Sequence, residues 1–154
     1  MAKSNNPIPD GFRTLTVHLT VNGAADYIEF LKRAFNAVEV SRMPGPGGKI
    51  MHAQVRIGDA VLMLNDNFPE FGSDFSKGPW PFTLHLYVPD ADVSFAQATG
   101  AGCKISMPLA DQFWGDRYGV VDDPFGVRWS IATHKEDLAP AEVEERMSKM
   151  SAAN

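Results

Sequence analysis

The chain has 154 residues, a formal net charge of -5 and 44% hydrophobic residues. This length and composition predict one domain with a core, or two tightly joined half-size modules, and exclude a disordered chain. The acidic balance argues against nucleic acid as a partner, because a protein that binds the phosphate backbone needs a basic face. The single cysteine, Cys103, excludes an intrachain disulfide and fits a reducing compartment, so we expect a cytoplasmic protein.

Neither a secretory signal nor a membrane segment is expected. Residues 1–10 carry Lys3 and two prolines, with no apolar stretch behind them. The longest apolar runs, such as residues 60–64, are far shorter than the ~20 residues that a membrane helix needs. We therefore expect no membrane partner.

The first half of the chain predicts a strand, a helix and three further strands. Residues 14–21 alternate and are rich in β-formers, and Asn22-Gly23 ends that strand. Residues 24–35 place apolar side chains at steps of three and four, which predicts one apolar face of a helix. Turn-forming residues then separate three more predicted strands, over residues 38–43, 50–57 and 60–64.

The second half predicts the same order after a connector rich in Pro, Gly and Phe, residues 67–81. We expect strands over residues 82–88, 103–108, 117–122 and 128–133, with a helix over residues 91–99. A shift of 67 residues superposes Thr16, His18, Leu19 and Val21 on Thr83, His85, Leu86 and Val88. We interpret this match as an internal duplication, with modules over residues 12–66 and 82–134. A C-terminal helix is expected over residues 139–150.

Two βαβββ modules that each begin with a Thr-x-His-Leu-x-Val strand resemble the vicinal oxygen chelate superfamily of glyoxalase I, extradiol dioxygenases and bleomycin-resistance proteins. The segments Ala24–Phe35, Met43-Pro44-Gly45-Pro46, Ile50–Ala53, Gly58-Asp59 and Trp114–Gly126 resemble its PhnB-like branch. The resemblance implies an α+β fold in which the two modules form a cup-shaped mixed sheet. It implies a pocket more firmly than a reaction.

In the enzymes of this superfamily, the first and last strands of the modules supply the ligands of a metal ion. The resemblance carries these positions over to Thr16, Met63, Thr83 and Ser130, none of which is His, Asp or Glu. Divalent metals in proteins prefer imidazole, carboxylate or thiolate ligands. We therefore expect no metal and no cofactor. His18 and His85, two residues further along, are expected to face the cup as polar lining; a divalent metal bound to them is the alternative.

Residues 111–118 place Trp114, Asp116, Arg117 and Tyr118 beside a glycine. One interpretation is a loop that closes the cup and offers ring faces and hydrogen bonds to a ligand. The other is a β-bulge in which Trp114 fills the core while Asp116 and Arg117 are solvated surface charges. Cys103 follows Gly102 on an apolar strand and is expected to be buried and inert.

These observations predict a protein that binds a small organic molecule in a metal-free cup. Metal-dependent lyase, isomerase or dioxygenase chemistry is the alternative, and a metal-free enzyme with a histidine base stays open. A homodimer is expected, because each module leaves a concave face and sheet edges uncovered; the modules pair within one chain or between two chains. The predicted ligand-binding residues are Thr16, His18, Met63, Thr83, His85, Trp114, Arg117 and Ser130.

Overall fold

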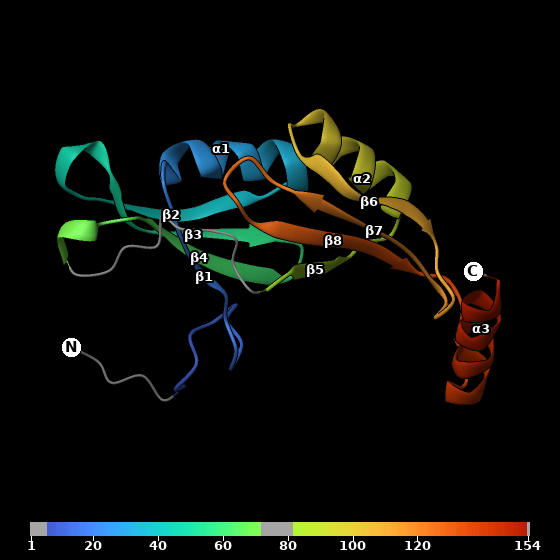
Figure 1. The fold of residues 1–154 in the computed structure, drawn as a ribbon. Helices are drawn as coiled ribbons and strands as arrows, with labels where there is room; N and C mark the ends of the chain where they lie inside the picture. The colour runs from blue at the N-terminus through green and yellow to red at the C-terminus, as the bar shows by residue number, and fades with distance from the viewer. Residues whose placement is uncertain (1–5, 72–81, 154) are drawn as a thin grey trace. The chain divides into compact units, whose positions relative to one another are not determined.

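The computed structural model describes residues 6–71 and 82–153, and the chain divides into two compact units, residues 1–78 and 79–154 (Figure 1). Each unit contains one four-stranded mixed sheet, so the predicted α+β class with tandem modules is confirmed. Of the predicted connector, residues 72–81 lie outside the described part of the chain.

Unit 1 has the sheet order β1-β4-β3-β2, in which β1 and β4 are parallel and the other neighbours are antiparallel. Its helix α1 lies against β1, β3 and β4 and buries Tyr27, Ile28 and Leu31. Leu19, Val55 and Leu64 are buried on the strands. The elements are β1 His18–Val21, α1 Ala24–Phe35, β2 Val38–Pro44, β3 Ile50–Ile57 and β4 Ala60–Asp66, with short helical turns at Pro46–Gly48 and Pro69–Phe71.

Unit 2 repeats this topology with the order β5-β8-β7-β6, and the pair β5 and β8 is parallel. Its helix α2 lies against β6, β7 and β8, and Phe95 of α2 reaches Gly119, where an added Cβ would lie 2.6 Å from the Phe95 ring. The elements are β5 Leu84–Tyr87, α2 Ala91–Gly100, β6 Lys104–Asp111, β7 Asp116–Asp122, β8 Arg128–His134 and α3 Pro140–Ala152.

The first strand of each unit begins later than the alternation predicts. β1 starts at His18 and β5 at Leu84, so Thr16 and Thr83 lie ahead of the strands. The hydroxyl of Thr16 donates to the carbonyl of Arg13 at 2.9 Å, a local bond that competes with strand pairing. Alternation indicates β-forming residues but not the length of the neighbouring strand, which pairs only with residues 18–21 and 84–87.

The duplication holds with a small correction to the single offset. His18 pairs with Met63 and His85 with Ser130, which is an offset of 67 on both strands. On the third strands, however, Ala53 opposite Leu64 corresponds to Gly119 opposite Ile131, which is an offset of 66. The difference arises because positions 57 and 60 of unit 1 correspond to positions 123 and 127 of unit 2, so three residues of unit 2 stand where unit 1 has the two-residue turn Gly58-Asp59.

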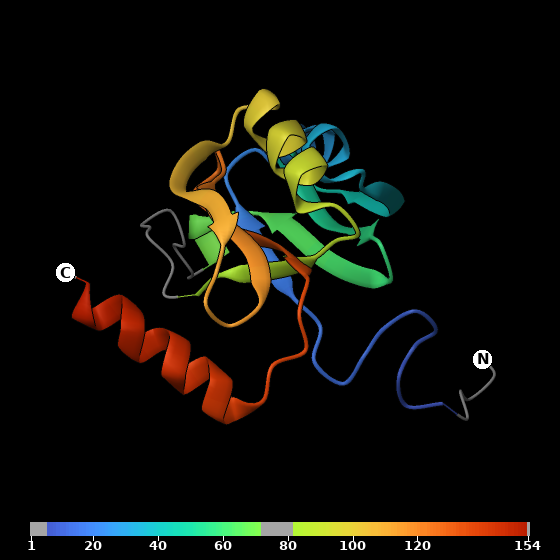
Figure 2. The same ribbon diagram turned by 90° about the vertical axis from the view of Figure 1, so that its right-hand side faces the viewer.

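The helix α3 confirms the C-terminal helix expected after the second module, and Figure 2 shows it beyond the end of β8. It has no buried residue, and Met147 and Met150 are exposed. Arg146 joins it to the segment after β8 through an ion pair with Glu136 at 2.6 Å. Among residues 6–71 and 82–153, no helix is both long and apolar enough to cross a membrane.

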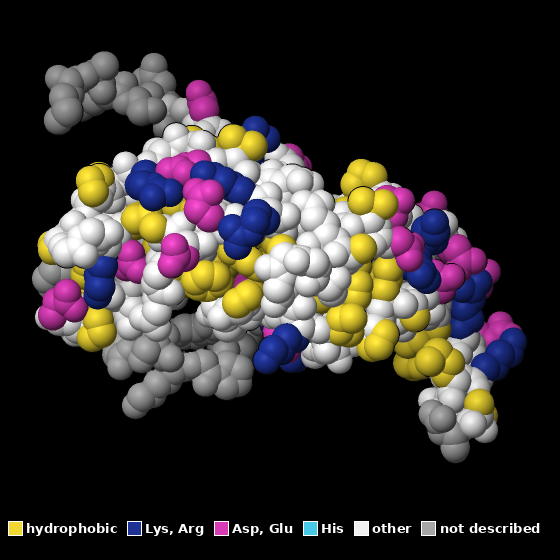
Figure 3. All heavy atoms as spheres, turned by 90° about the horizontal axis from the view of Figure 1, so that it is seen from above, with side chains coloured by type: hydrophobic (Ala, Val, Ile, Leu, Met, Phe, Trp, Pro, Cys, Tyr) yellow, Lys and Arg dark blue, Asp and Glu magenta, His cyan; other side chains and the backbone are white. Residues whose placement is uncertain are grey.

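Charged side chains of opposite sign lie next to one another in the view of Figure 3. In unit 1, Lys32 pairs with both Glu29 and Glu39, and Arg42 also pairs with Glu39. These pairs distribute both signs of charge along the surface of α1 and β2.

Candidate functional site

The sheet face opposite α2, called here the open face of unit 2, carries a cluster of rings. His85 and Tyr87 alternate with helix-facing leucines on β5, and Tyr118 stands on β7. Trp114 comes from the loop before β7. These four side chains, Tyr87, His85, Tyr118 and Trp114, are called the aromatic wall.

The rings of the aromatic wall contact one another in sequence. The His85 ring centroid lies 4.5 Å from Tyr87 and 5.9 Å from Tyr118, and it stacks on the latter. Tyr118 meets Trp114 edge to face at 5.2 Å. Such contacts add geometric preference to the area they bury, so the wall is a defined surface rather than a set of independent side chains.

Asp116 is hydrogen-bonded to two residues of the aromatic wall. Its carboxylate is only 5% exposed, and its Oδ2 accepts hydrogen bonds from the Trp114 indole at 3.1 Å and the Tyr87 hydroxyl at 3.2 Å. Its Oδ1 lies 2.8 Å from Nδ1 of His134. One buried carboxylate thus connects both ends of the aromatic wall.

The charge of Asp116 also affects Tyr87. Desolvation of the hydroxyl, and then the charge and hydrogen bond of Asp116, raise the pKa of Tyr87 above 10.0. The phenol therefore stays protonated at neutral pH and acts as a donor to Asp116.

His85 is held by a second contact beneath the wall. Its Nδ1 lies 2.6 Å from the hydroxyl of Ser130, which is buried on β8. Its Nε2 has no hydrogen-bond partner among the described residues.

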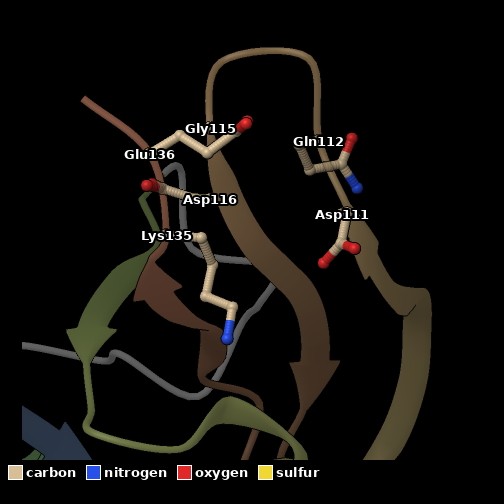
Figure 4. Close-up of a pocket in the computed structure, with 6 residues that line it drawn as sticks. All are labelled: Asp111, Gln112, Gly115, Asp116, Lys135 and Glu136. Carbon is tan, nitrogen blue, oxygen red and sulfur yellow. The ribbon is translucent and has the colours of Figure 1, made fainter. Parts of the chain in front are cut away.

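A polar pocket of about 250 Å³ lies at the end of the same sheet and shares Asp116 with the aromatic wall. Figure 4 shows Asp111 and Gln112 on one side of it and Lys135 and Glu136 on the other. Gly115 lies so close to the backbone of Glu136 that a side chain would not fit, because an added Cβ would be 2.6 Å from the carbonyl oxygen of Glu136. The lining residues are Asp111, Gln112, Gly115, Asp116, Lys135 and Glu136.

The open face of unit 1, which is the sheet face opposite α1, has the side-chain amide of Asn65 at its centre instead of a carboxylate. Oδ1 of Asn65 lies 2.7 Å from Nε2 of His18 and 3.3 Å from the hydroxyl of Thr20. The Asn65 amide nitrogen donates to the carbonyl of Asp66 at 2.7 Å, which fixes the orientation of the amide. His52 meets His18 edge to face at 5.7 Å.

The predicted ligand-binding residues fall into four groups. His85, Ser130 and Trp114 come together on the open face of unit 2, while His18 and Met63 are register partners in unit 1. Thr16 and Thr83 lie ahead of the strands. Arg117 lies on the side of α2, where its guanidinium bonds Asp92 at 2.7 and 2.8 Å and Asp111 at 3.2 Å.

The side chains at the superfamily's metal-ligand positions do not fit a divalent metal. Thr16, Met63, Thr83 and Ser130 offer hydroxyls and a thioether, which are weak ligands. The Ser130 hydroxyl is, moreover, engaged with His85. Within residues 6–71 and 82–153, no three His, Cys, Asp or Glu side chains gather as a metal site would require. The residues at these positions therefore do not support chemistry on a metal ion.

Asp116, Tyr87 and His134 belong to this cluster but were not among the predicted site residues. Asp116 is buried rather than a solvated surface charge, and His134 bonds two carboxylates although its ring is 53% exposed. Tyr87 could have been found, because it alternates with His85 and so shares its face. The contact between Asp116 and His134 joins residues 18 positions apart and has no local sequence pattern.

Cys103 is buried, as expected from its apolar surroundings. Burial, and then the charges of Asp123 and Asp122, raise the pKa of Cys103 to about 12. The thiol is therefore protonated at neutral pH and is not a nucleophile.

Known proteins share the fold of this chain, and a family model matches its sequence. The protein Rv0887c of Mycobacterium tuberculosis is 44% identical over 139 residues, which cover 87% of this chain and 82% of the relative. TioX from Micromonospora sp. ML1 is 26% identical with a TM-score of 0.64, over 79% of this chain and 98% of that one. The PhnB protein from Bacillus cereus shares the fold at 17% identity, with a TM-score of 0.64 over 79% of this chain and 99% of its own.

A family model described as the glyoxalase/bleomycin resistance protein/dioxygenase superfamily matches residues 13–131. The match extends from just before β1 of unit 1 into β8 of unit 2, so it includes both sheets and both open faces. The chain therefore belongs to the glyoxalase/bleomycin resistance protein/dioxygenase superfamily.

Proposed function

We propose that the protein binds a small organic molecule against the aromatic wall of unit 2 and does so without a metal ion. The observation that carries this proposal is the closed set of contacts around Asp116. Tyr87 and Trp114 are tied to one buried carboxylate, while His85 and Tyr118 fill the space between them. A preorganised surface of this kind lowers the ordering cost of binding.

The chemistry of the wall favours a ligand with a flat apolar part and a hydrogen-bonding group. Ring faces attract planar groups, and Nε2 of His85 can donate or accept one hydrogen bond. The proposal places the protein with the PhnB-like members of its superfamily, one of which shares its fold. The bleomycin resistance part of the superfamily's description is in keeping with such a binding role.

The binding proposal is tested by screening small aromatic compounds with saturation-transfer NMR and titrating the compounds that bind. His85→Ala should weaken binding about 5- to 30-fold, which corresponds to roughly 1 to 2 kcal/mol for one hydrogen bond, and leave the fold intact. Arg117→Ala is the matched control in the same unit, because its side chain lies on the side of α2. Equal losses in both variants, or compounds that bind equally well after His85→Ala, would contradict the proposal.

The second candidate is a metal-dependent lyase, isomerase or dioxygenase, which the superfamily's description also includes. The hydroxyl and thioether side chains at the expected ligand positions disfavour it. We expect no stoichiometric Zn, Ni, Mn or Fe in the protein purified and dialysed without chelator. Stoichiometric metal that is lost in His18→Ala or His85→Ala would promote the enzyme.

We also propose a cytoplasmic homodimer. Equivalent positions on the edge strands of the two units are apolar and exposed, namely Val38 and Val40 on β2 and Ile105 and Met107 on β6. Edge strands with exposed apolar side chains commonly gain protection from a partner. Sedimentation equilibrium at micromolar concentration should give about twice 16.9 kDa; a monomer over that range would contradict the homodimer.

A further inference from the structure

His134, at the end of β8, has a carboxylate beside each of its ring nitrogens. Nδ1 lies 2.8 Å from Oδ1 of Asp116, and Nε2 lies 2.8 Å from Oδ1 of Asp137. A neutral imidazole carries a single N–H, and an ionised carboxylate can only accept. Both hydrogen bonds therefore require one additional proton, and the imidazole has the highest ordinary pKa of the three groups.

The carboxylate on one side of this pairing is the one that holds the aromatic wall. Asp116 also accepts from Trp114 and Tyr87, and its side chain is 5% exposed. A buried negative charge is stable when it is hydrogen-bonded and compensated by a positive group. A protonated His134 supplies that charge at a distance of 2.8 Å.

The backbone that follows His134 is hydrogen-bonded to Gly115, the residue directly before Asp116. The amides of Lys135 and Glu136 both donate to the carbonyl of Gly115 at 3.0 Å. Glu136 in turn pairs with Arg146 of α3 at 2.6 Å. The position of the segment between β8 and α3 therefore depends on Gly115 and Asp116.

We infer that His134 is a proton-dependent positioning residue of the aromatic wall. As an imidazolium it bridges Asp116 and Asp137, and so fixes the carboxylate to which Trp114 and Tyr87 are bonded. As a neutral ring it keeps one N–H, and its other nitrogen presents a lone pair to a carboxylate. The segment after β8 and the Trp114 indole then lose a constraint. This inference rests on the proposed function only in treating the wall as the ligand site.

The direction of the pH dependence follows from the groups around the ring. The groups bonded to the ring are Asp116 at the start of β7 and Asp137 after β8. Tyr87 of β5 bonds Asp116, and Lys135 and Glu136 after β8 line a pocket together with Asp116. The hydrogen bonds to Asp137 and Asp116 raise the pKa of His134 above 6.5, while desolvation opposes them. Because the pKa is raised, both hydrogen bonds are present below pH 6.5, and one of the two is lost as the pH rises through the folded-state value.

The test uses the ligand-free protein and follows the ring nitrogens of His134 by long-range ¹H–¹⁵N NMR from pH 5 to 9. We expect both nitrogens to be protonated at pH 6 and a midpoint above 6.5. The indole N–H resonance of Trp114 should shift with the same midpoint, a readout that a merely structural residue would not give. Backbone relaxation should show α3 becoming more mobile over the same range.

Two carboxamide variants separate the contributions of Asp137 and Asp116 to the titration midpoint of His134. Asp137→Asn changes an exposed group and should lower the His134 midpoint in a folded protein; Asp116→Asn should lower it and abolish the titration of Trp114. Asp59→Asn, in the exposed turn before β4, should leave the midpoint unchanged. A wild-type midpoint at or below 6.5, a midpoint unchanged in Asp137→Asn, or a Trp114 resonance independent of His134 would overturn the inference. Failure of every aromatic compound to bind would contradict the proposed function alone.

Discussion

The two units share one strand pairing and differ in what stands at the centre of their open faces. His18 and His85 occupy equivalent positions, one opposite Met63 and the other opposite Ser130. His18 bonds the Asn65 amide, a neutral group. His85 lies instead within an aromatic wall that is held by the Asp116 carboxylate.

A second pair of equivalent positions shows how the same task is done by different chemistry. Asp66 in unit 1 accepts from the amides of Gly23, Ala24 and Ile50 at 2.9, 2.9 and 2.7 Å. Thr133 in unit 2 accepts from the amide of Ala91 at 2.8 Å. Both side chains satisfy the first amide of the helix that covers their sheet.

The comparison indicates which features the duplicated fold constrains. The register of β1 with β4 and of β5 with β8 is retained because a slip of one residue would turn buried side chains outward. The open face is not subject to that constraint. It could therefore become a set of rings around a carboxylate in one unit and an amide cluster in the other.

The largest expected difference between the units is at the helix anchor. Asp66→Ala leaves three amides without their acceptor and should lower the free energy of unfolding by about 3 kcal/mol. Thr133→Val removes one such bond and the bond that the hydroxyl donates to the carbonyl of Val88, and should lower the free energy of unfolding by about 1 to 2 kcal/mol. Urea unfolding followed by circular dichroism measures both values, and equal losses would contradict the unequal roles of the two anchors.

Gly115 in unit 2 and Gly58 in unit 1 both have a positive φ, but the space around them differs. Gly115 has φ of +98°, and an added Cβ would lie 2.6 Å from the Glu136 carbonyl oxygen. Gly58 has φ of +57° with nothing within 4 Å. Gly115→Ala should therefore destabilise by about 2 kcal/mol and Gly58→Ala by about 1 kcal/mol. A Gly115→Ala protein as stable as the wild type would show that the segment after β8 does not need this close approach.

Asn65 sharpens the comparison by fixing the tautomer of His18. Because its amide nitrogen donates to Asp66, its oxygen faces the ring, so neutral His18 must carry its proton on Nε2. Ring ¹⁵N shifts should show this tautomer in the wild type and a mixture in Asn65→Ala, with a loss of stability of about 1 kcal/mol. The Nδ1–H tautomer in the wild type would contradict this prediction.

The surface ion pairs of the two units should differ least in what they contribute to stability. Arg117 lowers the pKa of Asp92 below 3.8, so the contribution of this pair to stability is present above pH 3.8 and is lost as the pH falls through the folded-state value. Asp92 is 60% exposed, and solvent screens the pair. Asp92→Asn and, at an ion-paired carboxylate of unit 1, Glu39→Gln should both match the wild type at pH 7 within the error of urea titrations. A measurable loss in only one of them would reveal a role for that pair.

Local periodicity predicted most of the fold. Helix α1 and strand β3 have the predicted boundaries, 24–35 and 50–57, because both elements have strong repeats that end in turn-forming residues. The start of β1 was predicted wrongly because its length depends on β4. Alternation along β5 predicted which face of the sheet carries His85. It could not show which side chains would surround His85.

The candidate site was predicted only in part, because its contacts are between distant residues. Trp114 and His85 were identified from their positions in the predicted elements, whereas Arg117 bonds Asp92 on the side of α2. Asp is a residue type that is exposed on average and His one of intermediate burial, so residue type alone does not indicate that Asp116 is buried beside His134. Only the pairing of β7 with β8 brings them within 2.8 Å.

The sequence by itself therefore determined the duplication and the order of the elements, because these features depend on periodicity and residue type. The weak metal ligands at the superfamily's positions came from the family resemblance. The tertiary structure decided the centre of the candidate site. Burial of Asp116 beneath Trp114 and Tyr87, and its contact with His134, follow from strand register and a close approach at Gly115. Those contacts depend on the distances between atoms of different strands, which no local pattern of residues encodes.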